Sequence, residues 1–320
     1  MFINSVQNIS FKGIIDTHVH TGHWYKQGES GYYYGKNFTD NFKAPLRNTS
    51  GTSEADTFTR NTDRVDNMLV SDLDVMSEEY YRGEFFGNED FLKTLEEDPF
   101  YVPLAVCRPD KTNGDTKDIE KLLEKYPKSF AGFKFHPEAM NLPADDCRYE
   151  PYMKLAQEKN FPCMFHSEGE GVSGVRAIYN LAKKFPNVPV ILAHMGAGGA
   201  FCHQKAIDVF EESLKNDNAN LYVDLSWVDW ENGLPSFEKP SVKKVIDVAL
   251  QYDALDHILF ATDTPLGCFG ENPEGGKSPL EAYELSVETL QNFIKRNYPE
   301  NYNEILNGIF HDNAAKLFDI

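Results

Sequence analysis

The order of secondary-structure signals constrains the fold of this chain more than any other feature of its sequence. Short segments rich in β-branched and aromatic residues alternate with amphipathic segments of helical period through nearly the whole chain. The strand-like segments are residues 13–20, 70–77, 101–109, 129–137, 161–168, 189–196, 221–227 and 257–265. They are apolar on both faces, as are strands of a parallel sheet that helices cover. This alternation predicts a (β/α)8 TIM barrel.

The segments between these strands predict the helical layer of the barrel. The expected helices are residues 61–69, 88–97, 115–126, 149–160, 172–185, 201–215, 240–252, 279–297 and 302–318. An open, doubly wound sheet is the alternative architecture, but no G-x-G-x-x-G motif follows the first strand. We find no linker, and we expect a single domain over residues 1–320 without a terminal β-sandwich.

A long insertion interrupts the alternation after the first strand. Residues 21–60 are rich in Gly, Tyr, Asn and Thr without a sustained period, and we interpret them as a loop. A loop of this length in a compact domain tends to be functional or mobile. Its Trp24, Tyr32, Tyr33 and Tyr34 fit a lid over the site and packing on the barrel rim equally well.

Composition and charge exclude several classes of function. No run of about 18 apolar residues exists, so we expect no membrane span. The first ten residues lack the features of a signal peptide, and the five cysteines suit free thiols in a reducing cytoplasm. A formal net charge of −19 argues against nucleic acid and anionic membranes as partners. We expect a small-molecule substrate, and a homo-oligomer remains open.

Residues suited to metal binding stand where the first strand ends. Alternation places Asp16, His18 and His20 on one face of this strand, opposite Ile15 and its neighbours. Two imidazoles spaced in this way can converge on one ion, and neutral imidazole is a common zinc ligand. An isolated His-x-His pair also fits an ordinary polar strand end, so the later strands must decide between the two interpretations.

Three later strands end in residues that could complete such a site. The fifth strand ends in His166, the sixth in His194 and the eighth in Asp263. Alternation gives each an inward direction and places His194 on the same face as Leu192. Because active sites of these barrels lie at the carboxyl ends of the strands, the side chains are expected to converge at one mouth. Nitrogen and carboxylate ligands with an open position are typical of catalytic zinc.

These strand ends carry motifs that resemble the amidohydrolase superfamily, and in particular its branch called amidohydrolase 2. The matching segments are IIDTHVH at 14–20, GFKFHP at 132–137, FHSEGEG at 165–171, VPVILAHMG at 188–196, LYVDLS at 221–226, ILFATDTP at 258–265 and NAAKLF at 313–318. The set covers nearly the whole chain in order. The branch includes zinc-dependent decarboxylases of aromatic or related acids, and hydrolases of lactones and amides.

The resemblance implies a role for each strand-end residue. His18, His20, His166 and Asp263 match the metal ligands, and the expected ion is Zn²⁺, with Mn²⁺ or another divalent metal open. His194 matches the catalytic residue that activates water or moves a proton. A bound metal lowers the pKa of water, and Asp263 or His194 can then accept the proton.

Lys134, His136 and Arg108 are the candidate substrate-binding residues. Lys134 and His136 share a face of the fourth strand. In some relatives a lysine there is carboxylated and bridges two metals, but the resembled branch mostly uses one. We therefore expect Lys134 to contact a substrate anion or to serve as a structural cation, and His136 to line the pocket or bond a neighbouring loop. Arg108 could clamp a carboxylate or form a surface ion pair.

Two weaker patterns complete the site prediction. Glu168 and Glu170 follow a ligand strand and could hold the second ring nitrogen of a ligating histidine. The glycines within residues 196–199 precede a helix, and we interpret them as permitting a tight turn rather than as a phosphate site.

The sequence thus predicts a metal-dependent hydrolase that cleaves an ester, lactone or amide bond of a small molecule with activated water. Non-oxidative, zinc-dependent decarboxylation of a small aromatic or related acid is the alternative, because both reactions use one metal site. A non-catalytic barrel that binds metal or ligand is the third hypothesis.

Overall fold

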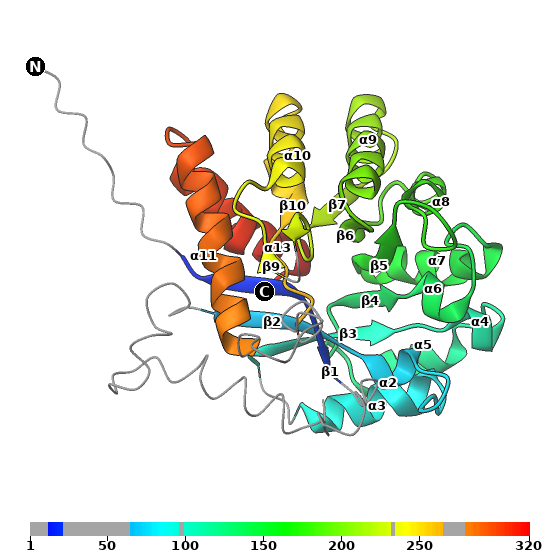
Figure 1. The fold of residues 1–320 in the computed structure, drawn as a ribbon. Helices are drawn as coiled ribbons and strands as arrows, with labels where there is room; N and C mark the ends of the chain where they lie inside the picture. Colours follow the sequence, from blue (N-terminus) through cyan, green and yellow to red (C-terminus); the bar gives the residue numbers. More distant parts are fainter. Residues whose placement is uncertain (1–11, 22–64, 96–98, 232–233, 265–278) are drawn as a thin grey trace, which may run out of the picture.

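The structure is a computed structural model that describes residues 12–21, 65–95, 99–231, 234–264 and 279–320 (Figure 1). Thr21 belongs to the first strand. The rest of the predicted insertion at 21–60, with Trp24 and Tyr32 to Tyr34, lies outside the described residues. Of the cysteines, Cys107, Cys147, Cys163 and Cys202 are free thiols, as predicted, and Cys268 lies outside the described part.

Eight parallel strands form a barrel, which confirms the predicted (β/α)8 fold. They are β1 (Ile14–Thr21), β2 (Val65–Asp72), β3 (Tyr101–Val106), β4 (Gly132–Phe135), β5 (Cys163–Glu168), β6 (Val190–Ala197), β7 (Leu221–Asp224) and β10 (Ile258–Leu259), in that order around the sheet. The residues after β10 close the barrel against β1. There Thr17 N–H donates to Phe260 O at 3.1 Å and Asp263 N–H donates to His18 O at 2.8 Å. A small antiparallel pair, β8 (Trp230–Glu231) and β9 (Leu234–Pro235), follows β7.

Helices line the outside of this barrel (Figure 1). They are α2 (Leu73–Met76), α3 (Glu84–Thr94), α4 (Pro109–Thr112), α5 (Lys117–Lys125), α6 (Pro137–Met140), α7 (Glu150–Lys159), α8 (Val175–Ala182), α9 (Ala200–Asn216), α10 (Pro240–Gln251), α11 (Pro279–Asn297), α12 (Tyr302–Asn307) and α13 (Asn313–Phe318). Short 3-10 turns lie at Cys147–Tyr149 and Leu255–His257, and a π-helical turn at Gly308–Asp312 joins α12 to α13. Among the described residues, no helix is both long and apolar enough to cross a membrane.

The prediction for the second strand–helix unit is wrong. The expected helix at 61–69 and strand at 70–77 are replaced by β2 at Val65–Asp72 and the short helix α2. Asp72 ends the strand because its carboxylate caps α2, accepting a hydrogen bond from Asp74 N–H at 2.9 Å. The alternating pattern of 70–77 therefore spans a strand end and a capped helical turn.

The first strand does not alternate regularly. Ile15 packs in the inner core with Met164 and Ile191, whereas Ile14 and Val19 pack in the outer core that the helices cover. The register of β1 against β2 shifts between Asp16 and Val19, which changes the face that successive residues occupy. The sequence analysis placed Asp16 on the same face as His18 and His20, and this prediction is wrong. The Asp16 carboxylate instead accepts Thr262 Oγ1–H at 2.6 Å and Thr262 N–H at 3.1 Å.

Candidate active site

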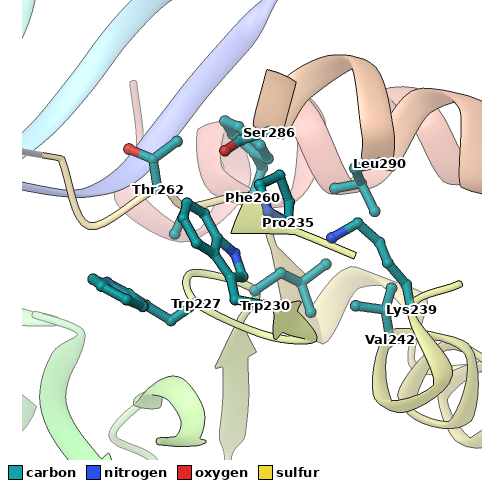
Figure 2. A pocket seen from close by; sticks show the side chains of 11 residues that line it. Trp227, Trp230, Pro235, Lys239, Val242, Phe260, Thr262, Ser286 and Leu290 are labelled. Atoms are coloured by element: carbon teal, nitrogen blue, oxygen red, sulfur yellow. The ribbon is translucent and has the colours of Figure 1, made fainter. Parts of the chain in front are cut away.

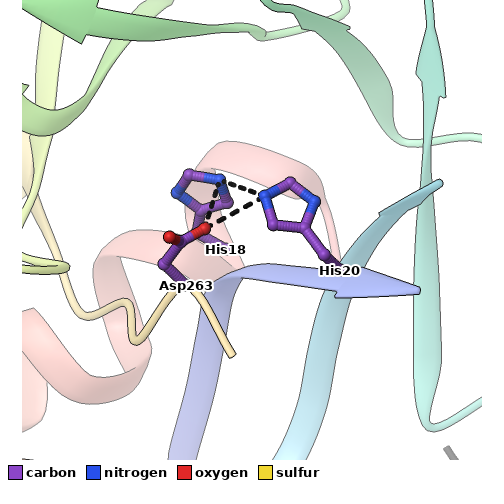
Figure 3. Close-up of side chains that lie close together, drawn as sticks. All are labelled: His18, His20 and Asp263. Carbon is purple, nitrogen blue, oxygen red and sulfur yellow. Dashed lines mark hydrogen bonds and ion pairs between the residues drawn. The ribbon is translucent and has the colours of Figure 1, made fainter. Parts of the chain in front are cut away.

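Three buried side chains meet at the carboxyl end of the barrel. His18 Nε2 lies 3.1 Å from His20 Nε2, and Asp263 Oδ1 lies 3.0 Å from His20 Nε2 and 3.4 Å from His18 Nε2 (Figure 3). Each of the three is almost completely shielded from solvent. We call these residues the inner group. The structure thus brings together three of the residues that the sequence proposed as metal ligands.

The other ring nitrogens of the two histidines are held by neighbouring strands. His18 Nδ1 lies 3.0 Å from Asp224 Oδ2, and His20 Nδ1 lies 2.9 Å from Ser71 Oγ. These partners orient both Nε2 atoms toward Asp263, as partners of metal-ligating histidines do. They were missed by the sequence analysis, which assigned this role to Glu168 and Glu170. The LYVDLS motif contains Asp224 at the end of a strand, and this was the available signal.

A buried lysine determines which nitrogen of His18 carries the proton. Lys134 Nζ lies 2.6 Å from His18 Nε2, and an ammonium group can only donate. His18 Nε2 therefore presents a lone pair, and its Nδ1–H donates to Asp224. Burial lowers the pKa of Lys134 to about 8, although Asp263 and Asp224 oppose this shift.

The inner group fits a divalent metal ion. Asp263 Oδ1 is buried and accepts no hydrogen bond within the described structure. It lies 3.4 Å from His18 Nε2, whose lone pair accepts the Lys134 ammonium in the absence of a metal. Electron-rich atoms this close together repel one another unless a cation lies between them. Two imidazole nitrogens and one carboxylate oxygen form a donor set that divalent transition metals accept, with a position left for water or substrate.

Asp263 is held in place by an indole and by its own backbone. Trp227 Nε1–H donates to Asp263 Oδ2 at 2.7 Å, which leaves Oδ1 directed at the histidines. Asp263 has φ +58, in the left-handed region that few residues other than glycine adopt, and its N–H donates to His18 O. Burial by itself would raise the pKa of Asp263, but His194, His18 and His20 hold it well below its ordinary value.

We expect Trp227→Phe to weaken metal binding. The phenyl ring keeps the packing against Trp230, but it removes the only donor to Asp263 Oδ2 in the described structure. Losing a partner of this kind typically costs about 10–100-fold in metal affinity. Competition with a chromophoric chelator measures the change, with Tyr222→Phe on β7 as the control. Equal affinities of the two variants would contradict the assigned role.

His194 lies beside the inner group and is oriented as a base. Its ring centroid is 4.8 Å from that of His18. Ser226 Oγ–H donates to Asp224 at 2.5 Å, so Ser226 can only accept from His194 Nδ1–H at 2.9 Å, which leaves Nε2 unprotonated. Burial lowers the pKa of His194 to about 4.

The inward direction of His194 does not come from strand alternation. Leu192 belongs to the outer core, while Ile191 and Ala193 lie in the inner core, so regular alternation would direct His194 outward. His194 instead adopts φ +61, and its N–H donates to Asp224 Oδ1 at 2.9 Å. The prediction that His194 shares a face with Leu192 is wrong, although the residue reaches the expected place.

His166 does not join the inner group. Its ring stacks on His136 with 3.9 Å between centroids, and its Nε2 lies 3.6 Å from Glu138 Oε2. The centroid of the His194 ring lies 5.0 Å from the centroid of the His166 ring. His136 Nδ1 accepts the N–H of Ala139, so it caps the start of α6. The structure therefore separates His166 from the three residues with which the sequence grouped it as a metal ligand, because its side chain turns toward the end of β4.

Arg108 is not available to a substrate, which corrects its prediction as a substrate-binding residue. It forms ion pairs, as the alternative prediction held, but its side chain is buried rather than on the surface. All five of its side-chain N–H groups are used. Nε and Nη2 hold the Asp110 carboxylate at 2.8 Å each, Nη2 also bonds Glu78 at 2.7 Å, and Nη1 donates to the carbonyls of Val75 at 3.1 Å and Met76 at 2.8 Å. The side chain is completely buried. It ties the segment after β3 to the end of α2.

We expect Arg108→Lys to destabilise the fold severely. An ammonium group cannot replace five planar donors, so Asp110 and two buried carbonyls lose partners. The expected loss in free energy of unfolding is about 3–5 kcal/mol. Urea denaturation measures it, with exposed Arg176→Lys as a control that should change stability by less than about 0.5 kcal/mol. Wild-type stability of Arg108→Lys would refute this assignment.

The carboxyl group of Glu84 makes stability depend on pH. It is buried, accepts hydrogen bonds from Arg108 N–H and from Tyr152 Oη–H, and its Oε2 has no partner in the described structure. Burial raises its pKa from 4.5 to about 8. Between these values the folded chain binds a proton that the unfolded chain has lost, so stability falls as pH rises through this window. Between about pH 6 and about pH 9, wild type should lose more stability than Glu84→Gln. Parallel pH profiles of their urea midpoints would contradict this.

The remaining predicted positions have structural roles. Glu170 is exposed and pairs with Lys205, and Glu168 N–H donates to Ser173 O at 2.9 Å. In the turn before α9, Gly196, Gly198 and Gly199 have φ of +73, +112 and +89, which confirms a turn that needs glycine.

The site and the barrel agree with a comparison against protein families. The family model described as Amidohydrolase matches residues 15–320, which is nearly the whole chain. The chain belongs to the amidohydrolase family. This confirms the resemblance seen in the strand-end motifs and makes the chain an enzyme of the amidohydrolase type. No curated protein matches the chain.

Solved structures of the same fold include several enzymes. A 5-carboxyvanillate decarboxylase from Novosphingobium aromaticivorans, complexed with manganese and 4-hydroxy-3-methoxy-5-nitrobenzoic acid, aligns with a TM-score of 0.58 and 13% identity over 96% of both chains. A probable 2-pyrone-4,6-dicarboxylic acid hydrolase from Acinetobacter baumannii has the same TM-score and identity, over 96% of this chain and 100% of its own. A putative amidohydrolase from Staphylococcus aureus has a TM-score of 0.61 and 14% identity, over 96% of this chain and 100% of its own.

Proposed function

We propose that this amidohydrolase is a divalent-metal-dependent hydrolase of an ester, lactone or amide bond in a small molecule. The observation that carries the proposal is the inner group. In it, an Asp263 oxygen that accepts no hydrogen bond from the described residues faces two oriented histidine nitrogens. His18, His20 and Asp263 would hold the ion, which we expect to be zinc, with manganese as the alternative. When bound, the ion polarises a substrate carbonyl and makes a water acidic enough to ionise near neutral pH.

The residues around the inner group supply the proton transfers of hydrolysis. His194 Nε2 accepts a proton from the attacking water, because its Nδ1–H is already committed to Ser226. Asp224, through Ser226, stabilises the imidazolium that results, and His194 then returns the proton to the leaving oxygen or nitrogen. Trp227 keeps Asp263 directed at the histidines throughout.

One observation favours non-oxidative decarboxylation as the second candidate. Lys134 is a buried cation beside His18 and can turn its ammonium to a substrate carboxylate. The neighbouring structures also include decarboxylases of aromatic acids. In this reaction His194, after accepting a proton, would deliver it to the carbon that loses carbon dioxide.

A combined metal and substrate assay tests the proposal. Purified protein is analysed for metals, stripped with a chelator and reloaded separately with zinc and manganese. Each form is then offered lactones, esters, amides and aromatic acids while acid release and carbon dioxide release are recorded. Metal-dependent acid release supports hydrolysis, and carbon dioxide release supports the second candidate. Metal-loaded protein that turns over no compound favours the non-catalytic barrel.

A further inference from the structure

A small cavity lies beside the inner group and shares none of its three residues. It has a volume of about 20 Å³ and lies between α11 and the segment that joins β7 to α10 (Figure 2). Its wall is mostly apolar, with Val242, Phe260 and Leu290 among the residues that form it. Among the described residues that line it, none is an aspartate or a glutamate. The cavity is large enough for one water-sized occupant.

Two nitrogen donors face into this cavity and have no acceptor among the described residues. Lys239 is 5% exposed, and its ammonium makes no ion pair or hydrogen bond with any part of the chain that the structure describes. The nearby Asp229 carboxylate accepts Ser241 N–H at 2.7 Å and Val242 N–H at 2.9 Å. Burial lowers the pKa of Lys239 to about 8, and the negative charge of Asp229 opposes this shift without a direct contact to the ammonium. The indole N–H of Trp230 also has no acceptor among the described residues. Figure 2 shows both nitrogen atoms directed into the space between the two side chains.

An anion is the occupant that this arrangement favours. A buried ammonium group without a partner is energetically costly, and a bound counter-ion removes that cost. The indole N–H of the half-buried Trp230 adds a second donor beside the apolar wall. A cavity that holds one water-sized occupant suits a monatomic anion better than a polyatomic one. We propose that Lys239 Nζ and Trp230 Nε1 bind one small monovalent anion, with chloride as the representative species.

The proposed anion site contacts the metal-binding machinery through two indoles. The Trp230 ring packs on Trp227 with 5.2 Å between centroids, and Trp227 donates to Asp263. An anion that fixes Trp230 therefore also restrains the residue that orients Asp263. Binding at this site is independent of which reaction the enzyme catalyses, so it can be tested without a substrate.

The test compares salts of equal ionic strength on the full-length protein. Wild type in sodium gluconate is titrated with sodium chloride, and the thermal midpoint should rise by a few degrees as chloride binds. Sodium bromide should quench tryptophan fluorescence in a saturable manner, because the heavy halide would contact Trp230. Lys239→Met should lose both effects. Lys244→Met removes an exposed lysine from α10, which Lys239 immediately precedes, and should behave like wild type.

Trp230→Phe separates a two-donor site from a general salt effect. It keeps Lys239 and removes only the indole N–H, so chloride should bind several-fold more weakly, as measured by the chloride dependence of the thermal midpoint. An unchanged chloride response in this variant overturns the two-donor site. The proposal also fails if wild type does not respond to chloride, if sodium sulfate stabilises it equally, or if Lys239→Met keeps the response. Should Lys239→Met not fold, the Trp230→Phe titration decides the question.

Discussion

Asp263→Asn should remove both metal and activity while leaving the fold intact. The amide oxygen can still accept Trp227 N–H, and asparagine tolerates the left-handed φ of this position. The variant therefore loses mainly the charged oxygen that faces His18 and His20. Because a catalytic metal contributes several kcal/mol of transition-state stabilisation, kcat/KM should fall by about 10³-fold or more.

Elemental analysis and steady-state kinetics on the same preparations measure these two losses. Asp208→Asn, an exposed substitution on α9, is the control and should retain wild-type metal and rate. Circular dichroism should show an unchanged fold in both variants. If Asp263→Asn retained a full complement of metal, the inner group would not be the metal site.

His194→Asn should separate catalysis from metal binding. Asparagine suits the positive φ of this position and can donate to Ser226, but it cannot accept and return a proton. Metal content should stay at the wild-type level because the inner group is intact. Loss of a general base typically costs about 10²–10⁴-fold in kcat.

The pH–rate profile gives a second readout for this variant. The acidic limb that titration of His194 produces in wild type should disappear in His194→Asn, and the remaining activity should rise with hydroxide concentration. His311→Asn, at a half-buried position outside the site, serves as the control. A His194→Asn variant with wild-type kcat would exclude the residue from the proton transfer.

Much of the fold could be predicted because barrel strands and helices have local signals. Short segments that are apolar on both faces indicate a covered parallel sheet, and their regular recurrence indicates closure. The second unit failed because Asp72 both ends β2 and caps α2. In the sequence, an aspartate that caps a helix looks like one more residue of an alternating strand. Only the structure shows that its carboxylate accepts the N–H of Asp74.

The candidate site could be predicted in part, since strand ends converge in any such barrel. His18, His20 and Asp263 meet as expected, although the roles assigned to them remain predictions. Asp224 was missed because its role depends on contacts with His18 and His194, which lie on other strands. Arg108 was wrongly assigned to substrate binding. Most of the acceptors that surround it come from another segment of the chain, so the sequence could not show that its five N–H groups are used.

The sequence by itself determined the parallel barrel, the family and the end of the barrel at which the reactive residues gather. These follow from periodicity and from the order of motifs along the chain. The tertiary structure decided the direction of each side chain. His194 and Asp263 turn inward through left-handed backbone conformations, and the shift in β1 turns Asp16 away from His18. Hydrogen bonds to residues far apart in sequence hold these conformations, and no local pattern records them.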